Sequence, residues 1–172
     1  MAFRPLGFGA LACAILGSTI VMTACDPSQV GPVEKLTIAG TEFTLKTALD
    51  NDSRSKGLGG VSELPENGGM LFVFPDSQVR SFWMDDCLMD IDIAYVNPLG
   101  IVTAVHTMTK EPPRGENESL EAYHNRLRLK TYSSRTPAQI AIELRPGMFN
   151  KLGIKRGSKI DLDLPRLKAA AK

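Results

Sequence analysis

Apolar and polar residues alternate in short runs along most of the chain, a pattern typical of half-buried β-strands. Residues 34–49 alternate on both sides of Gly40, which predicts two strands joined by a turn. The continuous apolar run from Met70 to Phe74 is too short for a helix and ends at Pro75, so it predicts a buried strand. Similar patterns predict further strands over residues 78–84, 91–96, 101–108, 138–144 and 159–164. We expect the first of these to pair with the apolar run, and the third to form a hairpin with the second.

Helical periodicity is confined to short segments. Residues 118–129 place apolar side chains near helical spacing, which predicts an amphipathic helix inside a polar insertion spanning residues 110–135. The segments 50–59 and 148–152 are each suited to one or two helical turns. The last residues, 166–172, are expected to form a flexible tail. Together these elements predict an α+β domain, mainly antiparallel β, of compact barrel-like or sandwich-like form with one or two short helices.

The beginning of the chain has the pattern of an export signal. Arg4 precedes an uncharged apolar stretch, and small residues then lead to Cys25. This arrangement resembles the lipobox of bacterial lipoproteins, in which the cysteine thiol receives a diacylglycerol and becomes the first residue of the processed protein. We therefore expect a signal peptide at 1–24, a lipidated tether at 25–33 and a single β-rich domain at 34–165. Two alternatives stay open: an ordinary signal peptide that is cut elsewhere, with Cys25 incidental, and a retained transmembrane anchor.

Charge and cysteine content narrow the classes of partner. The chain has 20 basic and 19 acidic residues, and the signal segment carries one of the basic residues and none of the acidic ones, which leaves 19 of each. This balance argues against a nucleic-acid partner, because such partners require a basic surface. Cys13 lies in the signal and Cys25 is the expected lipid site, so Cys87 is left alone and forms no intramolecular disulfide. The expected partners are a membrane, through the lipid on Cys25, and an unknown small ligand or envelope protein.

Three strings of the sequence resemble a known family. They are GGMLFVFP at 68–75, SFWMDDCLMDIDIAYVN at 81–97 and AIELRPGMFNKLGIKRGSKI at 141–160. In these strings the chain resembles the secreted prokaryotic family called domain of unknown function 192. The chain has Asp85-Asp86-Cys87 where that family commonly has Lys-Asn-Thr, has Gly59 where Met is common, and is longer than usual between residues 110 and 135. The resemblance implies an exported, small, β-rich domain and implies no settled activity.

The segment from Phe82 to Asp92 is the densest in chemically capable side chains. It contains Trp83, the only tryptophan of the chain, and amphipathic aromatic side chains often line ligand sites. Asp92 stands between two isoleucines, so a buried carboxylate there needs a partner, which Arg54 or Arg80 could supply. The residues that we expect to line a ligand groove are Arg54, Arg80, Trp83, Asp85, Asp86, Asp90 and Asp92.

Each of these positions also has another interpretation. The aspartates at 85–90 can form turns by bonding nearby backbone amides, and Cys87 can be a buried, inert thiol. A hydrolase-like alternative uses Asp90 or Asp92 as an acid or base, or Cys87 as a nucleophile beside His106 or His124. A copper-binding alternative uses thioether, thiolate and imidazole ligands, and its candidates are Met84, Cys87, Met89, His106 and Met108.

Motifs of several common enzyme classes are missing from the sequence. The chain contains no Gly-rich phosphate loop, no Gly-x-Ser-x-Gly elbow, no His-Glu-x-x-His and no Cys-x-x-Cys. We expect no cofactor. The leading hypothesis is a non-catalytic, lipid-anchored module of the cell envelope, in either the inner or the outer membrane. It is expected to bind a small ligand or a protein partner in a groove around the Phe-Trp-Met segment.

Overall fold

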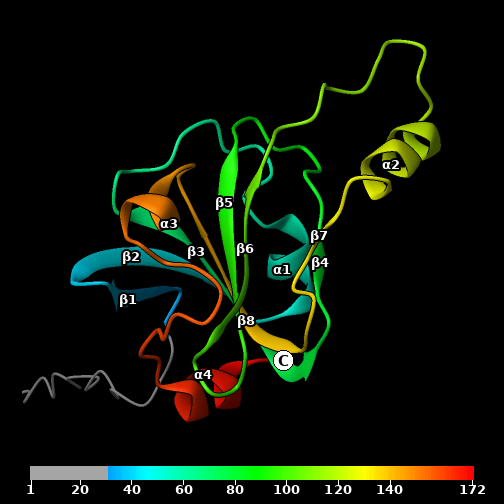
Figure 1. Cartoon of the computed structure of the whole chain (residues 1–172). Helices are drawn as coiled ribbons and strands as arrows, with labels where there is room; N and C mark the ends of the chain where they lie inside the picture. Colours follow the sequence, from blue (N-terminus) through cyan, green and yellow to red (C-terminus); the bar gives the residue numbers. More distant parts are fainter. Residues whose placement is uncertain (1–30) are drawn as a thin grey trace, which may run out of the picture.

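The computed structural model describes residues 31–172, which form a six-stranded sheet and a smaller two-stranded sheet (Figure 1). The strands are β1 (Val33–Ile38), β2 (Thr41–Ala48), β3 (Gly68–Gln78), β4 (Ser81–Phe82), β5 (Ile91–Val96), β6 (Val102–Met108), β7 (Tyr132–Ser133) and β8 (Ala138–Leu144). The helices are α1 (Asn51–Lys56), α2 (Leu120–Arg128), α3 (Met148–Lys151) and α4 (Leu164–Ala170). The larger sheet has the strand order β1-β2-β3-β8-β5-β6, and β4 pairs with β7 in the smaller one.

Neighbouring strands of the larger sheet are antiparallel, except for β2 and β3, which run parallel. A parallel pair needs a crossover connection, and here the crossover contains α1. The helix begins at a capping box: the Asp50 carboxylate accepts a hydrogen bond from the Ser53 N–H at 2.8 Å, and the Asp50 N–H donates to the Ser53 hydroxyl at 3.2 Å. Gly57, with a φ of 50°, ends it.

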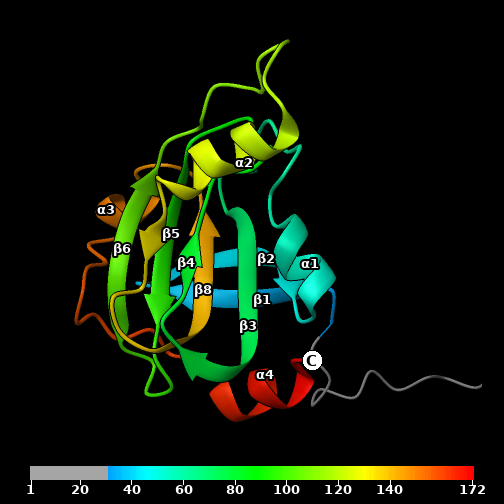
Figure 2. The same ribbon diagram turned by 90° about the vertical axis from the view of Figure 1, so that its right-hand side faces the viewer.

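Apolar side chains cover both faces of the larger sheet. On one face the sheet packs against Phe149 of α3 and Leu167 of α4. On the other face it packs against Leu58, which follows α1, and against Phe82 and Met84 in and after β4. Figure 1 shows α3 and α1 on opposite sides of the sheet, and Figure 2 shows the side on which α1 and α2 lie. The central strands β5 and β8 are consequently buried along their whole length.

The structure confirms the predicted fold class and most of the predicted elements. β1 and β2 lie on both sides of Gly40, β5 and β6 form the predicted hairpin, and α2 lies inside the segment 110–135. The sheet is mainly antiparallel and the helices are short. Of the two expected forms the sandwich-like one is found, because the sheet is open and has edges at β1 and β6.

The predicted strand at 78–84 is wrong in its length and in its partner. β3 continues through Pro75, and β4 contains only two residues. The proline is tolerated because the ladder between β3 and β8 is interrupted between Val73 and Gln78, so no backbone donor is required there. β4 pairs with β7 instead of β3. Alternation of side chains predicts that a strand exists but does not identify its partner.

The predicted last strand, at 159–164, and the predicted flexible tail are also wrong. Only an isolated bridge joins Lys159 to Ile101, and the chain then enters α4. The Asp163 carboxylate caps this helix by accepting a hydrogen bond from the Arg166 N–H at 3.2 Å. Leu167 is 2% exposed and belongs to the core, Leu164 and Ala171 pack against it, and Arg166 pairs with Glu34, so the segment is ordered by apolar packing and by polar contacts.

No helix within residues 31–172 is long and apolar enough to cross a membrane. The expected signal peptide and Cys25, together with most of the expected tether, lie outside the described residues.

We predict that Leu167→Ala lowers the free energy of unfolding by about 2–4 kcal/mol, because it leaves a cavity between α4 and the core. Chemical denaturation followed by circular dichroism measures the change. Lys168→Ala, at the exposed neighbouring position, is the matched control and should change the free energy by less than about 0.5 kcal/mol. Equally small effects of both substitutions would show that α4 does not pack on the domain.

Candidate functional site

A pocket of about 300 Å³ lies beside Trp83, between α1, β3 and the segment that follows β4. We call it the Trp83 pocket. It is lined by Asn51, Arg54, Ser55, Lys56, Gly57, Leu58, Gly59, Phe72, Phe74, Ser81, Phe82, Trp83, Asp85, Cys87 and Glu143. This lining combines aromatic rings with a few charged groups, and the volume is at the lower end of the range of small-molecule sites.

Phe82 organises the aromatic wall of the pocket. Its ring centre lies 4.9 Å from that of Phe72, 6.4 Å from that of Phe74 and 5.7 Å from that of Tyr95, each time with the rings nearly perpendicular. Edge-to-face packing of this kind is favoured by the ring quadrupoles. Because Phe82 is held by these rings and by the β4–β7 pairing, the next residue, Trp83, is placed against the pocket.

The lining of the Trp83 pocket includes a buried carboxyl group that has no hydrogen-bond partner among residues 31–172. Glu143 lies on β8, between β3 and β5, and is 4% exposed. Its Oε2 atom makes no hydrogen bond within the described part of the chain. Burial raises the pKa of the Glu143 carboxyl to about 8, so the group is mostly protonated at neutral pH. An unsatisfied buried polar group costs about 1–3 kcal/mol, and a strongly shifted pKa in a pocket marks a candidate functional residue.

Glu143 is not among the site residues predicted from the sequence, although its sequence context contains the signal. Glu143 stands between two apolar residues of β8, as Asp92 does in β5. Asp92 is 2% exposed, but both of its oxygens have partners: Oδ1 accepts from the Thr107 hydroxyl at 2.7 Å and Oδ2 accepts from the Phe149 N–H at 3.2 Å. These contacts hold the start of α3, so the partner of Asp92 is not one of the expected arginines. Asp92 does not line the Trp83 pocket.

The other three aspartates are divided between the pocket and the turns around it. Asp85 lines the Trp83 pocket. Asp86 is exposed, with a φ of 51°, and its carbonyl accepts a hydrogen bond from the Gly60 N–H at 2.9 Å. Asp90 accepts a hydrogen bond from the Lys110 N–H at 2.8 Å, which fixes the start of the insertion. The Asp86 contact is made by its backbone and the Asp90 contact reaches an amide 20 residues away, so neither is the local side-chain turn that was expected for the segment 85–90.

Both expected arginines stack on Phe74. The guanidinium carbon lies 5.3 Å from the ring centre for Arg54 and 4.1 Å for Arg80. Arg54 lines the Trp83 pocket, and burial lowers the pKa of its guanidinium. Its N–H groups donate to three acceptors, the Val73 carbonyl, the Asn51 side-chain oxygen and the Lys172 carbonyl. Arg80 pairs with Asp76 and lies outside the pocket lining.

Helix α2 of the insertion covers Trp83 from outside. The His124 ring centre lies 5.9 Å from that of Trp83, and the Arg128 guanidinium carbon lies 5.2 Å from the Trp83 ring. His124 Nε2 also lies 3.5 Å from the Asp85 carboxylate. A second hollow, of about 480 Å³, separates the insertion from the segment 85–88. The insertion is therefore part of the surroundings of the site.

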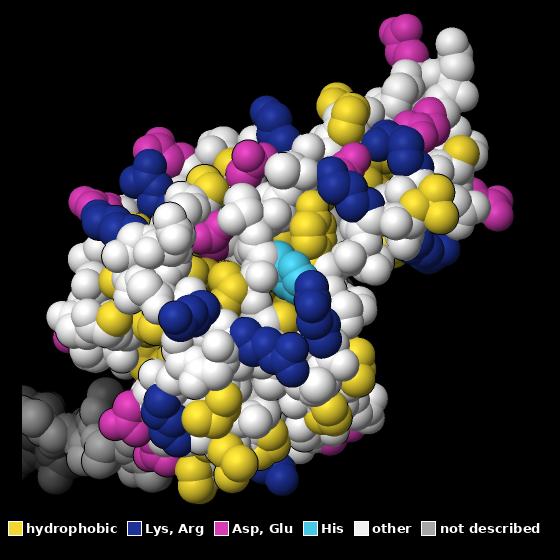
Figure 3. All heavy atoms as spheres, viewed as in Figure 1, with side chains coloured by type: hydrophobic (Ala, Val, Ile, Leu, Met, Phe, Trp, Pro, Cys, Tyr) yellow, Lys and Arg dark blue, Asp and Glu magenta, His cyan; other side chains and the backbone are white. Residues whose placement is uncertain are grey.

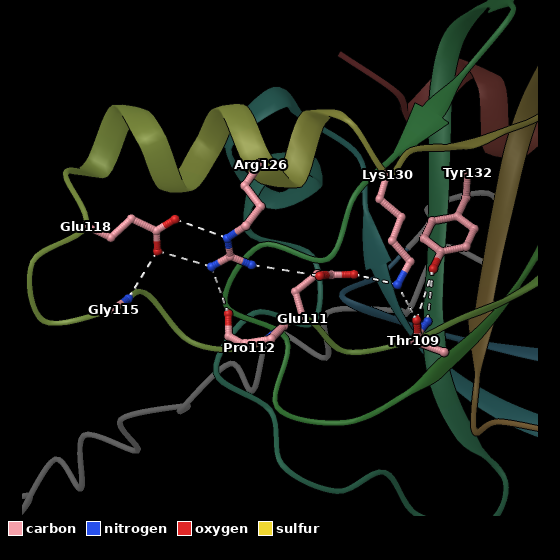
Figure 4. A network of polar contacts seen from close by, with 8 residues as sticks. All are labelled: Thr109, Glu111, Pro112, Gly115, Glu118, Arg126, Lys130 and Tyr132. Atoms are coloured by element: carbon pink, nitrogen blue, oxygen red, sulfur yellow. Dashed lines mark hydrogen bonds and ion pairs between the residues drawn. The ribbon is translucent and has the colours of Figure 1, made fainter.

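A polar network fixes the insertion to the sheet (Figure 4). Glu111 pairs with Lys130 at 2.6 Å and with Arg126 of α2 at 3.8 Å. Lys130 also donates to the Thr109 hydroxyl at 2.7 Å, and the Thr109 N–H donates to the Tyr132 hydroxyl at 3.1 Å. Thr109 directly follows β6 and Tyr132 begins β7. The two ends of the insertion are thus joined to each other by hydrogen bonds next to β6 and β7.

The surface seen in Figure 3 carries charges of both signs. Acidic and basic side chains are interspersed over it, and a group of Lys and Arg side chains lies in the middle of the view, beside a histidine. This face therefore carries charges of both signs and one local cluster of basic side chains.

The thiol and the proposed copper ligands are mostly engaged in packing. Burial and the nearby acidic groups raise the pKa of the Cys87 thiol to about 12, which removes the thiolate that a nucleophile or a soft-metal ligand requires. Met84 and Met108 are 2% and 1% exposed and belong to the core, and Met89 packs against it. The ring Nε2 of His106 is hydrogen-bonded to the Ser133 carbonyl at 2.8 Å. Within residues 31–172, no three or more His, Cys, Asp and Glu residues gather in a way that could hold a metal ion.

Comparison with protein families identifies this chain as one of an uncharacterised group. The model of the family described as DUF192, Uncharacterized ACR, matches residues 34–162. The chain belongs to this family, which confirms the resemblance seen in the sequence. No match is found among the curated proteins.

Two solved structures share the fold. One is a proposed transcription regulator from Sinorhizobium meliloti 1021, with 21% identity and a TM-score of 0.59, which covers 75% of this chain and 90% of that one. The other is a protein of unknown function from Novosphingobium aromaticivorans DSM 12444, with 22% identity and a TM-score of 0.57, which covers 76% of this chain and 85% of that one. At such identities the similarity establishes the fold alone.

We predict that the protein loses stability as the pH rises from about 5 to 8, and that Glu143→Gln removes this loss. The folded pKa of Glu143, about 8, lies above the ordinary value of 4.5. Between these values the unfolded chain releases the proton and the folded chain keeps it. The contribution of Glu143 to the free energy of unfolding is therefore fully present below pH 4.5 and is lost as the pH rises through 8. The free energy of unfolding falls over this range by up to about 1.4 kcal/mol per pH unit.

Urea denaturation of wild type and Glu143→Gln across this pH range measures the difference. Glu63→Gln, at an exposed acid, is the matched control and should leave the pH dependence of wild type in place. A constant difference between wild type and Glu143→Gln at every pH would mean that Glu143 is ionised in the folded protein.

Proposed function

We propose that this DUF192 protein is a binding module that holds a small organic ligand in the Trp83 pocket. The observation that carries the proposal is Glu143, a buried carboxyl group in the lining of an aromatic pocket, whose Oε2 atom has no hydrogen-bond partner among residues 31–172. Folding alone gains nothing from such a group. A ligand that hydrogen-bonds to it would recover the lost interaction, while apolar parts of the ligand pack against Phe72 and Phe82.

The position of Trp83 supports the same proposal. The indole lines the pocket on one side and meets His124 and Arg128 of α2 on the other. A ligand in the pocket therefore touches a residue that also contacts the insertion. We propose that the insertion helps to retain the ligand, because it covers the outer side of Trp83.

We also propose that the module is anchored to the cell envelope by a lipid on Cys25. The support is the order of the first residues: a basic residue, an uncharged apolar stretch, small residues and then the cysteine. A lipid at this position would hold the domain at a membrane surface and would give it access to small molecules of the envelope.

The first prediction from the proposed function concerns Trp83. Because Trp83 is the only tryptophan, its fluorescence reports on the pocket without labelling. A fragment screen should yield compounds that change this emission and raise the melting temperature. Among those compounds, Trp83→Phe should weaken binding about 3- to 10-fold, because a smaller aromatic ring keeps only part of the contact. Trp83→Ala should weaken it by more than 10-fold.

Melting temperature and NMR shifts follow binding in the two variants that lack the indole. Leu99→Ala, at an exposed position outside the pocket, is the control and should bind as wild type does. If a folded Trp83→Ala protein bound every ligand with unchanged affinity, the Trp83 pocket would not be the site.

The second prediction concerns the anchor. In a bacterial host, the wild-type protein should carry the mass of a diacylglycerol and partition with membranes, and Cys25→Ser should lose both the mass and the processing. Cys87→Ser, which changes the other cysteine outside the signal, should keep both. Intact-mass spectrometry and membrane fractionation make the measurement. Identical, unlipidated, soluble products from all three proteins would exclude the anchor.

A further inference from the structure

The charged groups of the Trp83 pocket differ in how free they are to meet a ligand. The guanidinium of Arg54 already donates hydrogen bonds to three acceptors of the protein. Lys56 lies at the exposed surface of α1. Glu143, in contrast, is 4% exposed and its Oε2 atom has no partner in the described part of the chain, and Asp85 lines the same pocket. Among the ionisable groups that line the pocket, the buried one that is available to a ligand is therefore acidic.

The aromatic faces around this pocket already attract cations of the protein itself. Arg54 and Arg80 both stack on Phe74, and Arg128 lies over Trp83. Such contacts form because the face of an aromatic ring is the negative end of its quadrupole. Phe72 and Phe82 line the interior of the same pocket. A cation that entered would find aromatic carbon on its sides and a carboxyl group below it.

We infer that the ligand is an organic cation, a primary or secondary ammonium on a compact apolar body, whose N–H groups reach Glu143. This inference rests on the proposed function and specifies its ligand class. Binding replaces the O–H of the Glu143 carboxylic acid with an ammonium–carboxylate contact, and the displaced proton goes to solvent. No covalent bond of the ligand changes. The buried ion pair is formed only in the complex, so the free protein does not carry an isolated charge in its core.

Several titratable or charged groups line the same pocket as Glu143 or interact with it electrostatically. They are Asp85 and Cys87 in the loop, Tyr95 on β5, and Arg54 and Lys56 of α1. Burial raises the pKa of the Cys87 and Tyr95 side chains, so both stay neutral near pH 7. His124 of α2 lies 3.5 Å from Asp85, and measurements in a His124→Gln background separate the effect of Glu143 from that of this histidine. Glu143 is then the group whose charge the ligand changes.

Three ligands of matched shape test the inference: benzylamine, benzyl alcohol and benzoate, which carry a positive, a neutral and a negative group on the same ring. Titrations at pH 7, followed by Trp83 fluorescence and NMR, should show benzylamine binding at least 10-fold more tightly than the other two. Calorimetry in two buffers of different ionisation enthalpy should show release of up to one proton per amine bound. The affinity for benzylamine should rise between pH 6 and pH 8, as less work is needed to ionise Glu143.

Glu143→Gln is the decisive variant, because it keeps the shape of the side chain and removes its ability to ionise when the ligand binds. It should weaken benzylamine at least 10-fold, abolish proton release and change benzyl alcohol less than about 3-fold. Glu63→Gln should behave as wild type. Circular dichroism and the melting temperature confirm that both variants are folded, and the substitution is expected to be tolerated because the wild-type carboxyl is mostly protonated in the free protein.

The outcomes separate the ligand class from the pocket itself. If benzyl alcohol or benzoate binds at Trp83 as tightly as benzylamine or more tightly, the inference that the ligand is a cation is wrong, and the pocket is still a ligand site. An unchanged benzylamine affinity in Glu143→Gln also overturns the inference. If none of the three compounds binds, the inference is wrong, and the proposed function is lost as well only when the wider fragment screen also leaves Trp83 unchanged.

Discussion

The central position of β8 constrains everything around it. The strand pairs with β3 on one side and β5 on the other, and apolar layers cover both faces, so each of its side chains is removed from water. In such a strand, every polar group must find a partner inside the protein. Gln139 meets this condition, because its side-chain N–H donates to the Phe74 carbonyl at 3.2 Å. The Oε2 atom of Glu143 has no such partner among residues 31–172, and the candidate site is built around this carboxyl group.

The parts of the fold that the sequence predicted are those governed by local pattern. β1, β2, β5, β6 and β8 each alternate or run apolar in the way that their own burial requires. The wrong predictions concern which other segments a given segment pairs with or packs against in the folded protein. Pro75 continues β3 because the ladder beside it is interrupted, and residues 159–164 alternate like a strand but make only an isolated bridge there. Pairing partners and docking partners lie far away in the sequence, so local periodicity does not contain them.

The candidate site was predictable in the same partial way. Trp83, Asp85 and Arg54 do line one pocket. Asp92 and Glu143 both stand inside apolar strands, so sequence alone could have marked both as buried acids in need of partners. Which one lacks a partner depends on the face of the sheet to which each side chain points. Asp92 meets the start of α3, whereas Glu143 faces the aromatic wall, and neither neighbour is close in sequence.

The insertion has a small interior of its own. Tyr123 and Leu127 of α2 are buried, yet they belong to neither apolar cluster of the sheet. The segment joins the rest of the domain through the two-position β4–β7 ladder, a polar network and the contacts to Trp83. A unit that shares so little core with its neighbours opens at a lower free energy than the whole domain. Local opening of the insertion would uncover Trp83 while the sheet stays intact, so exchange of solutes at Trp83 would not require global unfolding.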